Sequence, residues 1–228
     1  GGDGIKTNSD EDGKGYVTIN GGTVNIDSYA DGIQAEQTFT MNGGEISGNT
    51  ANGGGVAIIG STMVMNGGKI SNNSTYKTSG QGSYGAGVYV ADYANASGGD
   101  TLFTAQPASF EMNGGKITGN TALDYGGGVL TFPQQSQKIT IDINNGEISG
   151  NQVTKGSGGA IAAFFGVTEL NIKGGTLTGN SAYQFGGGVF LYQATKVTIS
   201  GGMISENKAL RGGGGVCLRE GPADRRRY

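Results

Sequence analysis

The sequence predicts an all-β protein: a single-stranded, right-handed parallel β-helix of about seven coils, each with three short strands. Three observations support this fold class. Glycine is abundant, at 48 of 228 residues, and there are only 3 prolines, which excludes collagen and proline-rich linkers. The glycines recur with a period, and three short patterns follow one another in fixed order. Periodic glycine indicates a solenoid, whereas aperiodic glycine indicates disorder.

The first pattern alternates apolar and polar residues and ends on a polar residue. Such a short alternation is typical of a β-strand with one buried face. Its copies are residues 17–20, 39–42, 63–66, 110–113, 141–144, 170–173 and 197–200. We therefore expect one strand of each coil at these positions.

The second pattern is a Gly-Gly turn that leads into a second strand and ends on asparagine. Its copies are residues 43–49, 67–73, 114–120, 145–151, 174–180 and 201–207, with a divergent copy at 21–26. Each full copy carries one aliphatic residue, such as Ile46 or Ile70, which we expect to stack in an interior row. The terminal asparagines, such as Asn49 and Asn73, are expected to form an internal or corner ladder of amides bonded along the helix axis.

The third pattern is a glycine-rich run before one aliphatic residue. Its copies are residues 53–56, 85–88, 126–129, 158–161, 186–189 and 213–216, and 31–33 occupy the same place in the N-terminal coil. Three strands and three corners thus fill roughly 22–30 residues, the period of a β-helix. Strands of successive coils would pair about 4.8 Å apart. We expect one domain over residues 1–220 and a disordered tail over 221–228.

Composition excludes several function classes. The net charge of −3 offers no electrostatic basis for nucleic-acid binding. Cys217 is the single cysteine, so no internal disulfide can form, and histidine, the usual general base and zinc ligand, is absent. No apolar run approaches the ~20 residues of a transmembrane helix. We expect a secreted piece of a longer protein, with flanking domains, at the bacterial cell surface.

Two insertions, 74–84 and 91–109, interrupt the repeat and are rich in aromatic residues. Long loops on one side of a solenoid are where binding usually occurs. The candidate ligand-binding residues in them are Tyr76, Tyr84, Tyr93 and Phe103. Further aromatic residues near corners are Tyr125, Phe132, Phe164, Phe165, Tyr183, Phe185 and Tyr192. These rings would either stack on sugar rings or cover the core beneath the loops.

The acidic N-terminus is a candidate cation site. Asn8, Asp10 and Asp12 match the start of an EF-hand loop, but Ile19 stands where the bidentate glutamate is required, which rejects that motif. Asp3 and Asp31 each precede Gly-Ile one coil apart. Two carboxylates about 5 Å apart repel unless a cation or a proton lies between them. Either a calcium site of another geometry or a plain hydrophilic loop fits this pattern.

Residues 1–40 resemble the calcium-binding, carbohydrate-binding β-helix domains of cellulolytic anaerobic bacteria. The shared features are a repeated Asp-Gly-Ile, the Asp-Glu-Asp insertion that ends in Gly-Tyr, and Gly-Gly-Thr. The resemblance implies a calcium-bearing β-helix that binds cell-wall polysaccharide such as cellulose or pectin. It implies that Asp3, Asp10, Asp12 and Asp31 are the cation ligands.

Residues 41–217 resemble adhesin-like repeats of the polymorphic outer-membrane-protein type. That family pairs Phe-x-x-Asn with Gly-Gly-Ala-Ile. Here Ile or Leu replaces the Phe, while residues 158–161 match the second motif literally. The resemblance implies display and adhesion, without defining a ligand.

Three functions remain open from the sequence. The leading one is a non-catalytic, adhesin-like β-helix that binds polysaccharide or a host or bacterial surface glycan and is stabilised by calcium. The alternatives are a pectinase-like polysaccharide lyase or hydrolase, and a structural surface stalk. Outside the N-terminus acidic residues are sparse. Glu45 and Glu147 share one slot with Lys69 and Lys116, which indicates a soluble charged face.

Overall fold

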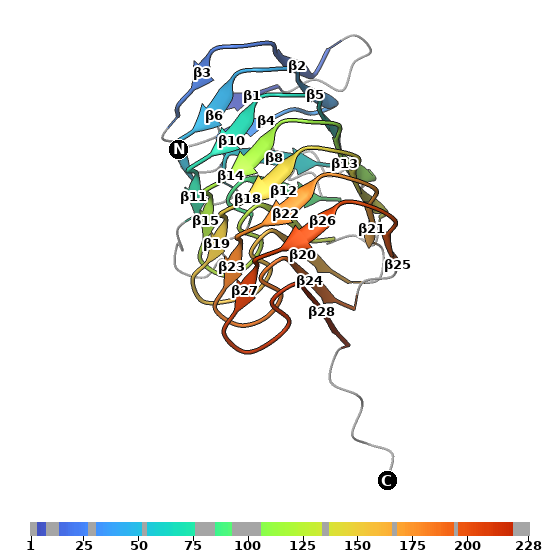
Figure 1. Ribbon diagram of the computed structural model, residues 1–228. Helices are drawn as coiled ribbons and strands as arrows, with labels where there is room; N and C mark the ends of the chain where they lie inside the picture. The colour runs from blue at the N-terminus through green and yellow to red at the C-terminus, as the bar shows by residue number, and fades with distance from the viewer. Residues whose placement is uncertain are drawn as a thin grey trace.

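The computed structural model describes residues 4–7, 14–26, 31–51, 54–75, 85–92, 106–133, 137–165, 168–193 and 196–220. Across these residues the secondary structure consists of β-strands, with no helix. The strands form coils that stack on one another from the N-terminus to the C-terminus (Figure 1). Every strand pairs in parallel with its counterparts in the neighbouring coils, which confirms the predicted parallel β-helix.

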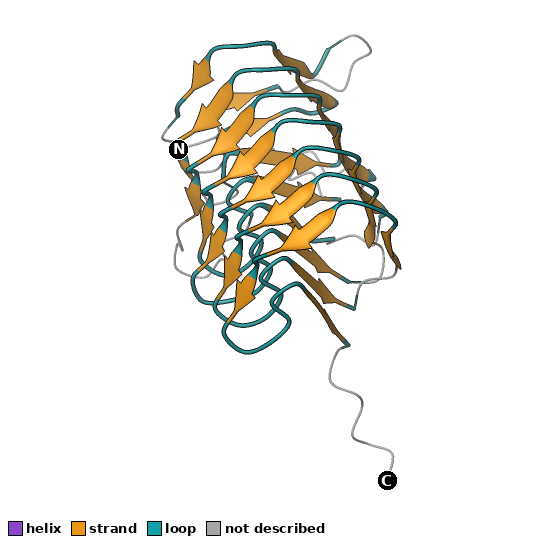
Figure 2. Cartoon of the chain, in the orientation of Figure 1, coloured by secondary structure: helices purple, strands orange, loops and turns teal. Residues whose placement is uncertain are grey.

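Each full coil contributes strands to four sheets, because a short fourth strand joins the expected three (Figure 2). Sheet A contains β1 (Ile5–Lys6), β4 (Ile33–Gln34), β8 (Val56–Ile59), β12 (Val88–Ala91), β16 (Val129–Thr131), β20 (Ile161–Phe164), β24 (Val189–Tyr192) and β28 (Val216–Arg219). Sheet B contains β2 (Tyr16–Ile19), β5 (Thr38–Met41), β9 (Thr62–Met65), β13 (Ala108–Met112), β17 (Ile139–Ile143), β21 (Thr168–Ile172) and β25 (Lys196–Ile199).

The other two sheets hold the shorter strands. Sheet C contains β3 (Thr23–Val24), β6 (Glu45–Ser47), β10 (Lys69–Ser71), β14 (Lys116–Thr118), β18 (Glu147–Ser149), β22 (Thr176–Thr178) and β26 (Met203–Ser205). Sheet D contains β7 (Thr50–Ala51), β11 (Ser74–Thr75), β15 (Thr121–Ala122), β19 (Gln152–Val153), β23 (Ser181–Ala182) and β27 (Lys208–Ala209). The strands of sheet D have two residues each, too few for an alternation signal, which is why the sequence patterns did not predict them.

The register stacks each repeat position on its own kind. Ile46 pairs with Ile70, and Ile70 pairs with Ile117, so the predicted aliphatic row of sheet C is confirmed. The row of sheet A, which begins with Val56 and Val88, is confirmed in the same way. These side chains are fully buried and belong to one apolar core that continues along the helix axis. A single coil could not bury this surface, so the stack depends on its neighbours.

The Gly-Gly turns join sheet B to sheet C and require glycine for two reasons. Gly115, the second residue of one such turn, has φ of +81°, a conformation that L side chains rarely adopt. A Cβ there would lie 2.7 Å from Cε of Met65 and 2.8 Å from the carbonyl oxygen of Gly67. The coils therefore approach one another too closely at this corner for any larger residue.

The two insertions are shorter than the sequence predicted, because residues at their ends belong to strands. Ser74 and Thr75 form β11, which pairs with β7 and β15. Ala91 ends β12, and Ala108 begins β13. Residues 76–84 and 93–105, and the tail 221–228, lie outside the described residues.

Candidate functional site

Sheet A differs from a half-solvated sheet because both of its faces carry apolar side chains. In β24, Val189 and Leu191 face the core, whereas Phe190 and Tyr192 belong to a second cluster on the outer face. We call this second group the sheet A aromatic cluster. Its buried members are Ala57, Tyr89, Ala91, Leu130, Ala162, Phe164 and Phe190. Its half-buried members are Ile59, Tyr125, Phe132, Phe185, Tyr192 and Cys217.

Phe164 lies at the centre of the rings in this cluster. Its centroid is 4.7 Å from that of Tyr125, 5.7 Å from that of Phe190 and 5.8 Å from those of Phe132 and Tyr192. The planes are tilted or edge-to-face, the arrangements that the ring quadrupole favours. The cluster is thus a packed aromatic surface and not a scatter of single rings.

The glycine-rich corners before sheet A deliver two of these rings. Isolated parallel bridges join Tyr125 to Ser157 and Phe185 to Gly212, so the stacking of coils continues into the corners. Phe185 stacks on Phe190 at 6.4 Å, and the guanidinium of Arg219 lies 4.5 Å from the Phe185 ring centroid, within cation–π range.

The structure brings together most of the aromatic residues that the sequence placed near corners. Tyr125, Phe132, Phe164, Phe165, Phe185 and Tyr192 lie in or against the cluster. Tyr183 does not: it is exposed and has Arg211 6.0 Å from its ring centroid. Sequence reasoning missed Phe190, which could have been found from its place directly after the Gly-Gly-Gly-Val pattern.

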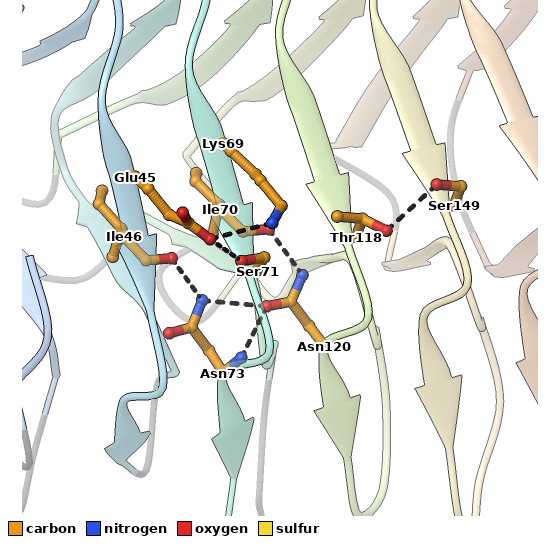
Figure 3. A network of polar contacts seen from close by, with 9 residues as sticks. All are labelled: Glu45, Ile46, Lys69, Ile70, Ser71, Asn73, Thr118, Asn120 and Ser149. Atoms are coloured by element: carbon orange, nitrogen blue, oxygen red, sulfur yellow. Dashed lines mark hydrogen bonds and ion pairs between the residues drawn. The ribbon is translucent and has the colours of Figure 1, made fainter. Parts of the chain in front are cut away.

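The recurring asparagines form the predicted ladder, and the structure places it in the interior. Nδ2 of Asn73 donates to Oδ1 of Asn120 at 3.0 Å, and the backbone N–H of Asn73 donates to the same oxygen at 3.0 Å (Figure 3). Nδ2 of Asn120 donates to the carbonyl oxygen of Ile70 at 3.0 Å and to Oδ1 of Asn151 at 2.9 Å. These amides bond to one another and to the backbone, so their role is structural.

The outer face of sheet C is polar and bears paired charges. Lys69 lies 3.0 Å from Glu45, and Lys116 lies 2.7 Å from Glu147. The hydrogen bond from Ser71, together with Lys69, lowers the pKa of Glu45, and Lys116 with Ser149 lowers the pKa of Glu147. A shallow hollow of about 480 Å³ lies beside Glu147 and Thr176. A general acid requires a raised carboxyl pKa, so these glutamates do not suit that role.

The outer face of sheet B also carries carboxylates, and these too are engaged. The register places Glu111 beside Asp142 on β13 and β17. Glu111 accepts a hydrogen bond from Asn144 at 3.1 Å, and Asp142 accepts one from Lys173 at 2.8 Å. Glu111 and Asp142 therefore belong to a network of polar side chains on the protein surface.

Most of the predicted site residues fall outside the described residues. These are Tyr76, Tyr84, Tyr93 and Phe103 among the ligand-binding candidates, and Asp3, Asp10 and Asp12 among the cation ligands. Asp31 is described and half-buried, and its backbone carbonyl accepts the N–H of Gly4 at 2.9 Å. Its side chain carries carboxylate oxygens, which are the ligands that calcium prefers.

The described residues contain no group of three or more His, Cys, Asp or Glu side chains placed to hold a metal ion. They also contain no helix with the length and apolar character needed to cross a bilayer.

A family model described as carbohydrate-binding domain-containing protein matches residues 1–126. No curated protein and no solved structure matches the chain. The matched region runs from the N-terminal coils through both insertions to the corner that holds Tyr125. Because the match spans residues 1–126 of 228, this protein belongs to the carbohydrate-binding domain-containing family.

Proposed function

We propose that this chain is a non-catalytic, adhesin-like β-helix that binds cell-wall polysaccharide at the bacterial cell surface and is stabilised by calcium near its N-terminus. The observation that carries the proposal is the family match over residues 1–126, which contains both insertions. A carbohydrate partner follows from that family. The cell-surface location, the polysaccharide class and the calcium are the parts that experiment must test.

Chain connectivity places the two insertions at opposite ends of one strand. Residues 76–84 end directly before Gly85, three residues ahead of β12. Residues 93–105 begin directly after Asp92, which follows β12. The outer face of β12 carries Tyr89, the first ring of the sheet A aromatic cluster. We infer that Tyr76, Tyr84, Tyr93 and Phe103, in the insertions that join the two ends of this strand, bind glycan.

A polysaccharide pull-down tests the binding. The chain is mixed with insoluble cellulose and with immobilised polygalacturonate, with calcium or with chelator, and bound protein is measured. We expect retention on at least one of them, and its loss when Tyr76, Tyr84, Tyr93 and Phe103 are all changed to alanine. Tyr183→Ala removes an exposed ring outside the cluster and serves as the matched control. An unbound wild-type chain on every cell-wall glycan would refute the proposal.

Thermal melting tests the calcium. A ligand that binds the folded state alone raises the melting temperature in proportion to the logarithm of its concentration. We expect calcium to raise the melting temperature, chelator to reverse the rise, and Asp31→Asn to reduce it. Asp142→Asn changes a carboxylate on sheet B and should leave the calcium response intact. A melting temperature indifferent to calcium and chelator would remove the metal from the proposal.

A further inference from the structure

Four rings pack together at the edge of sheet A that leads to sheet B, and we call this group the platform. Phe164 and Tyr192 are register partners at the ends of β20 and β24, and Phe132 follows β16 one coil earlier. The rings of Phe132 and Tyr192 are each 5.8 Å from that of Phe164, so the three form a ladder along the helix axis. Phe165 is the fourth ring, and it contacts every ring of the ladder.

Phe165 caps the ladder and remains open to solvent. Its centroid is 5.6 Å from that of Phe132, 6.0 Å from that of Phe164 and 6.0 Å from that of Tyr192. Its plane stands at 79° to Phe132 and 83° to Tyr192. Phe165 is 37% exposed, whereas Phe164 beneath it is 6% exposed. The ladder thus holds one ring in a defined orientation at the surface.

The backbone at Phe165 adopts a conformation that suits glycine better than phenylalanine. Its φ is +63°, in the left-handed region that bulky residues rarely occupy. Gly60 and Gln193 follow sheet A strands in other coils with φ of +57° and +51°. Asp92 and Pro133 stand at the same register position after β12 and β16 and do not have positive φ, so the corner can be turned without it. Where the left-handed conformation is adopted, a glycine satisfies it without strain. Strain of this kind at an exposed aromatic residue points to a role for the ring.

Polar side chains border this platform on the C-terminal side. Gln193 is exposed and has the equivalent position one coil further on. Arg219, the register partner of Tyr192, is exposed and lies against Phe185. Both side chains carry N–H donors beside an otherwise apolar surface.

We infer that Phe165, the exposed ring of the platform, stacks on a pyranose ring of a neutral glycan with equatorial hydroxyls. The inference rests on the carbohydrate-binding role proposed above and extends it to residues beyond the family match, which ends at 126. A pyranose with equatorial hydroxyls presents C–H groups on its faces, and these pack on the negative face of an aromatic ring. Gln193 would bond its hydroxyl groups. The four rings carry no charge, and the guanidinium of Arg219 lies 4.5 Å from the ring centroid of Phe185, so we expect a neutral sugar to bind better than a uronate.

A titration with two soluble probes tests the inference. Cellohexaose is the neutral probe and hexagalacturonate is the acidic one, and binding is followed by calorimetry and by the ring resonances of labelled phenylalanine. We expect cellohexaose to bind and to shift the Phe165 resonances, with weaker binding of hexagalacturonate. Phe165→Gln should weaken cellohexaose binding by about tenfold or more, since the stacking contact is lost.

The variants separate loss of binding from loss of fold. Phe165→Gln copies Gln193, which already has the same backbone conformation one coil away, and Phe165→Gly relieves the strain entirely. Both should keep the coil stack, which thermal melting will show, and both should lose cellohexaose binding. Tyr183→Ala, which removes an exposed ring outside the platform, should bind as the wild type does.

The outcomes distinguish this inference from the proposed function. Full cellohexaose binding by Phe165→Gln, or unshifted Phe165 resonances in the wild type, would overturn the platform. In either case, pull-down by polysaccharide that depends on the four loop aromatics would leave the broader carbohydrate-binding proposal in place. A wild-type chain silent in both assays would end both.

Discussion

Two asparagine ladders run along this β-helix, one inside and one on the surface. The interior ladder lies between sheets C and D and consists of Asn49, Asn73, Asn120, Asn151, Asn180 and Asn207. The surface ladder lies between sheets B and C and consists of Asn20, Asn42, Asn66, Asn113 and Asn144. In both, Nδ2 of one coil donates to Oδ1 of its neighbour. The repeated residue and the repeated bond are the same.

Burial makes the two ladders energetically different. Asn120 is 0% exposed, and its side chain accepts two and donates two hydrogen bonds. Asn113 is exposed and makes one bond to each neighbouring rung. A buried donor that loses its partner incurs the full cost of desolvation, whereas an exposed one turns to water. Repetition alone therefore does not show that a residue is important for stability.

The largest effect is expected from breaking the interior ladder. Asn120→Ala leaves the backbone N–H and one amide N–H of Asn73 without an acceptor, and the carbonyl of Ile70 without that donor. At 1–3 kcal/mol for each buried group, we expect a loss of about 4 kcal/mol in the free energy of unfolding. Urea denaturation measures it. A loss below about 1 kcal/mol would show that the interior ladder is no more important than the surface one.

The turn next to the surface ladder should be more sensitive than the ladder itself. Gly115→Ala places a Cβ 2.7 Å from Cε of Met65, at a residue with φ of +81°. We expect a loss of about 3 kcal/mol from strain and displacement together. Gly150→Ala is the matched control, because its φ is +61° but its nearest neighbours are 4.0 Å away. If both variants melt alike, close packing of the coils does not explain the glycine.

The surface ladder should tolerate interruption. Asn113→Ala removes bonds of 3.2 Å to Asn66 and 2.9 Å to Asn144, and water can replace each of them. We expect a change of about 0.5 kcal/mol or less in the free energy of unfolding. Measured beside Asn120→Ala under the same conditions, a comparable loss would contradict the assignment of burial as the cause.

The smallest effect concerns Glu169 and the two lysines beside it on the surface of sheet B, and it depends on pH. Lys138 and Lys196 each lie 2.6 Å from Glu169 and lower its pKa from 4.5 to about 2. Because the folded-state pKa is lowered, this stabilisation is present above pH 4.5 and is lost as the pH falls toward 2. The melting temperature should fall as the pH is lowered through that interval. The fall should be smaller in Glu169→Gln and in high salt. Identical pH profiles for wild type and variant would rule out a contribution from Glu169.

The fold could be predicted well and the candidate site only in part. Ile46, Ile70 and Ile117 recur in one slot, and identical slots stack because every strand pairs with its counterpart one coil away. The repeat pattern did not predict which aromatic side chains on the outer face of sheet A would be buried. Phe164 and Phe165 are adjacent in sequence, yet one is buried and the other is the exposed ring of the platform.

By itself, the sequence determined the stack, the register and the interior rows, because a period states which residues meet along the axis. Tertiary structure decided what meets across the coil. A Cβ at Gly128 would lie 3.3 Å from Nδ2 of Asn151 in the next coil, so the glycine-rich corners pack against the asparagine ladder on another side of the helix. Which parts of a coil face one another depends on the corner angles, and a repeat in one dimension does not contain them.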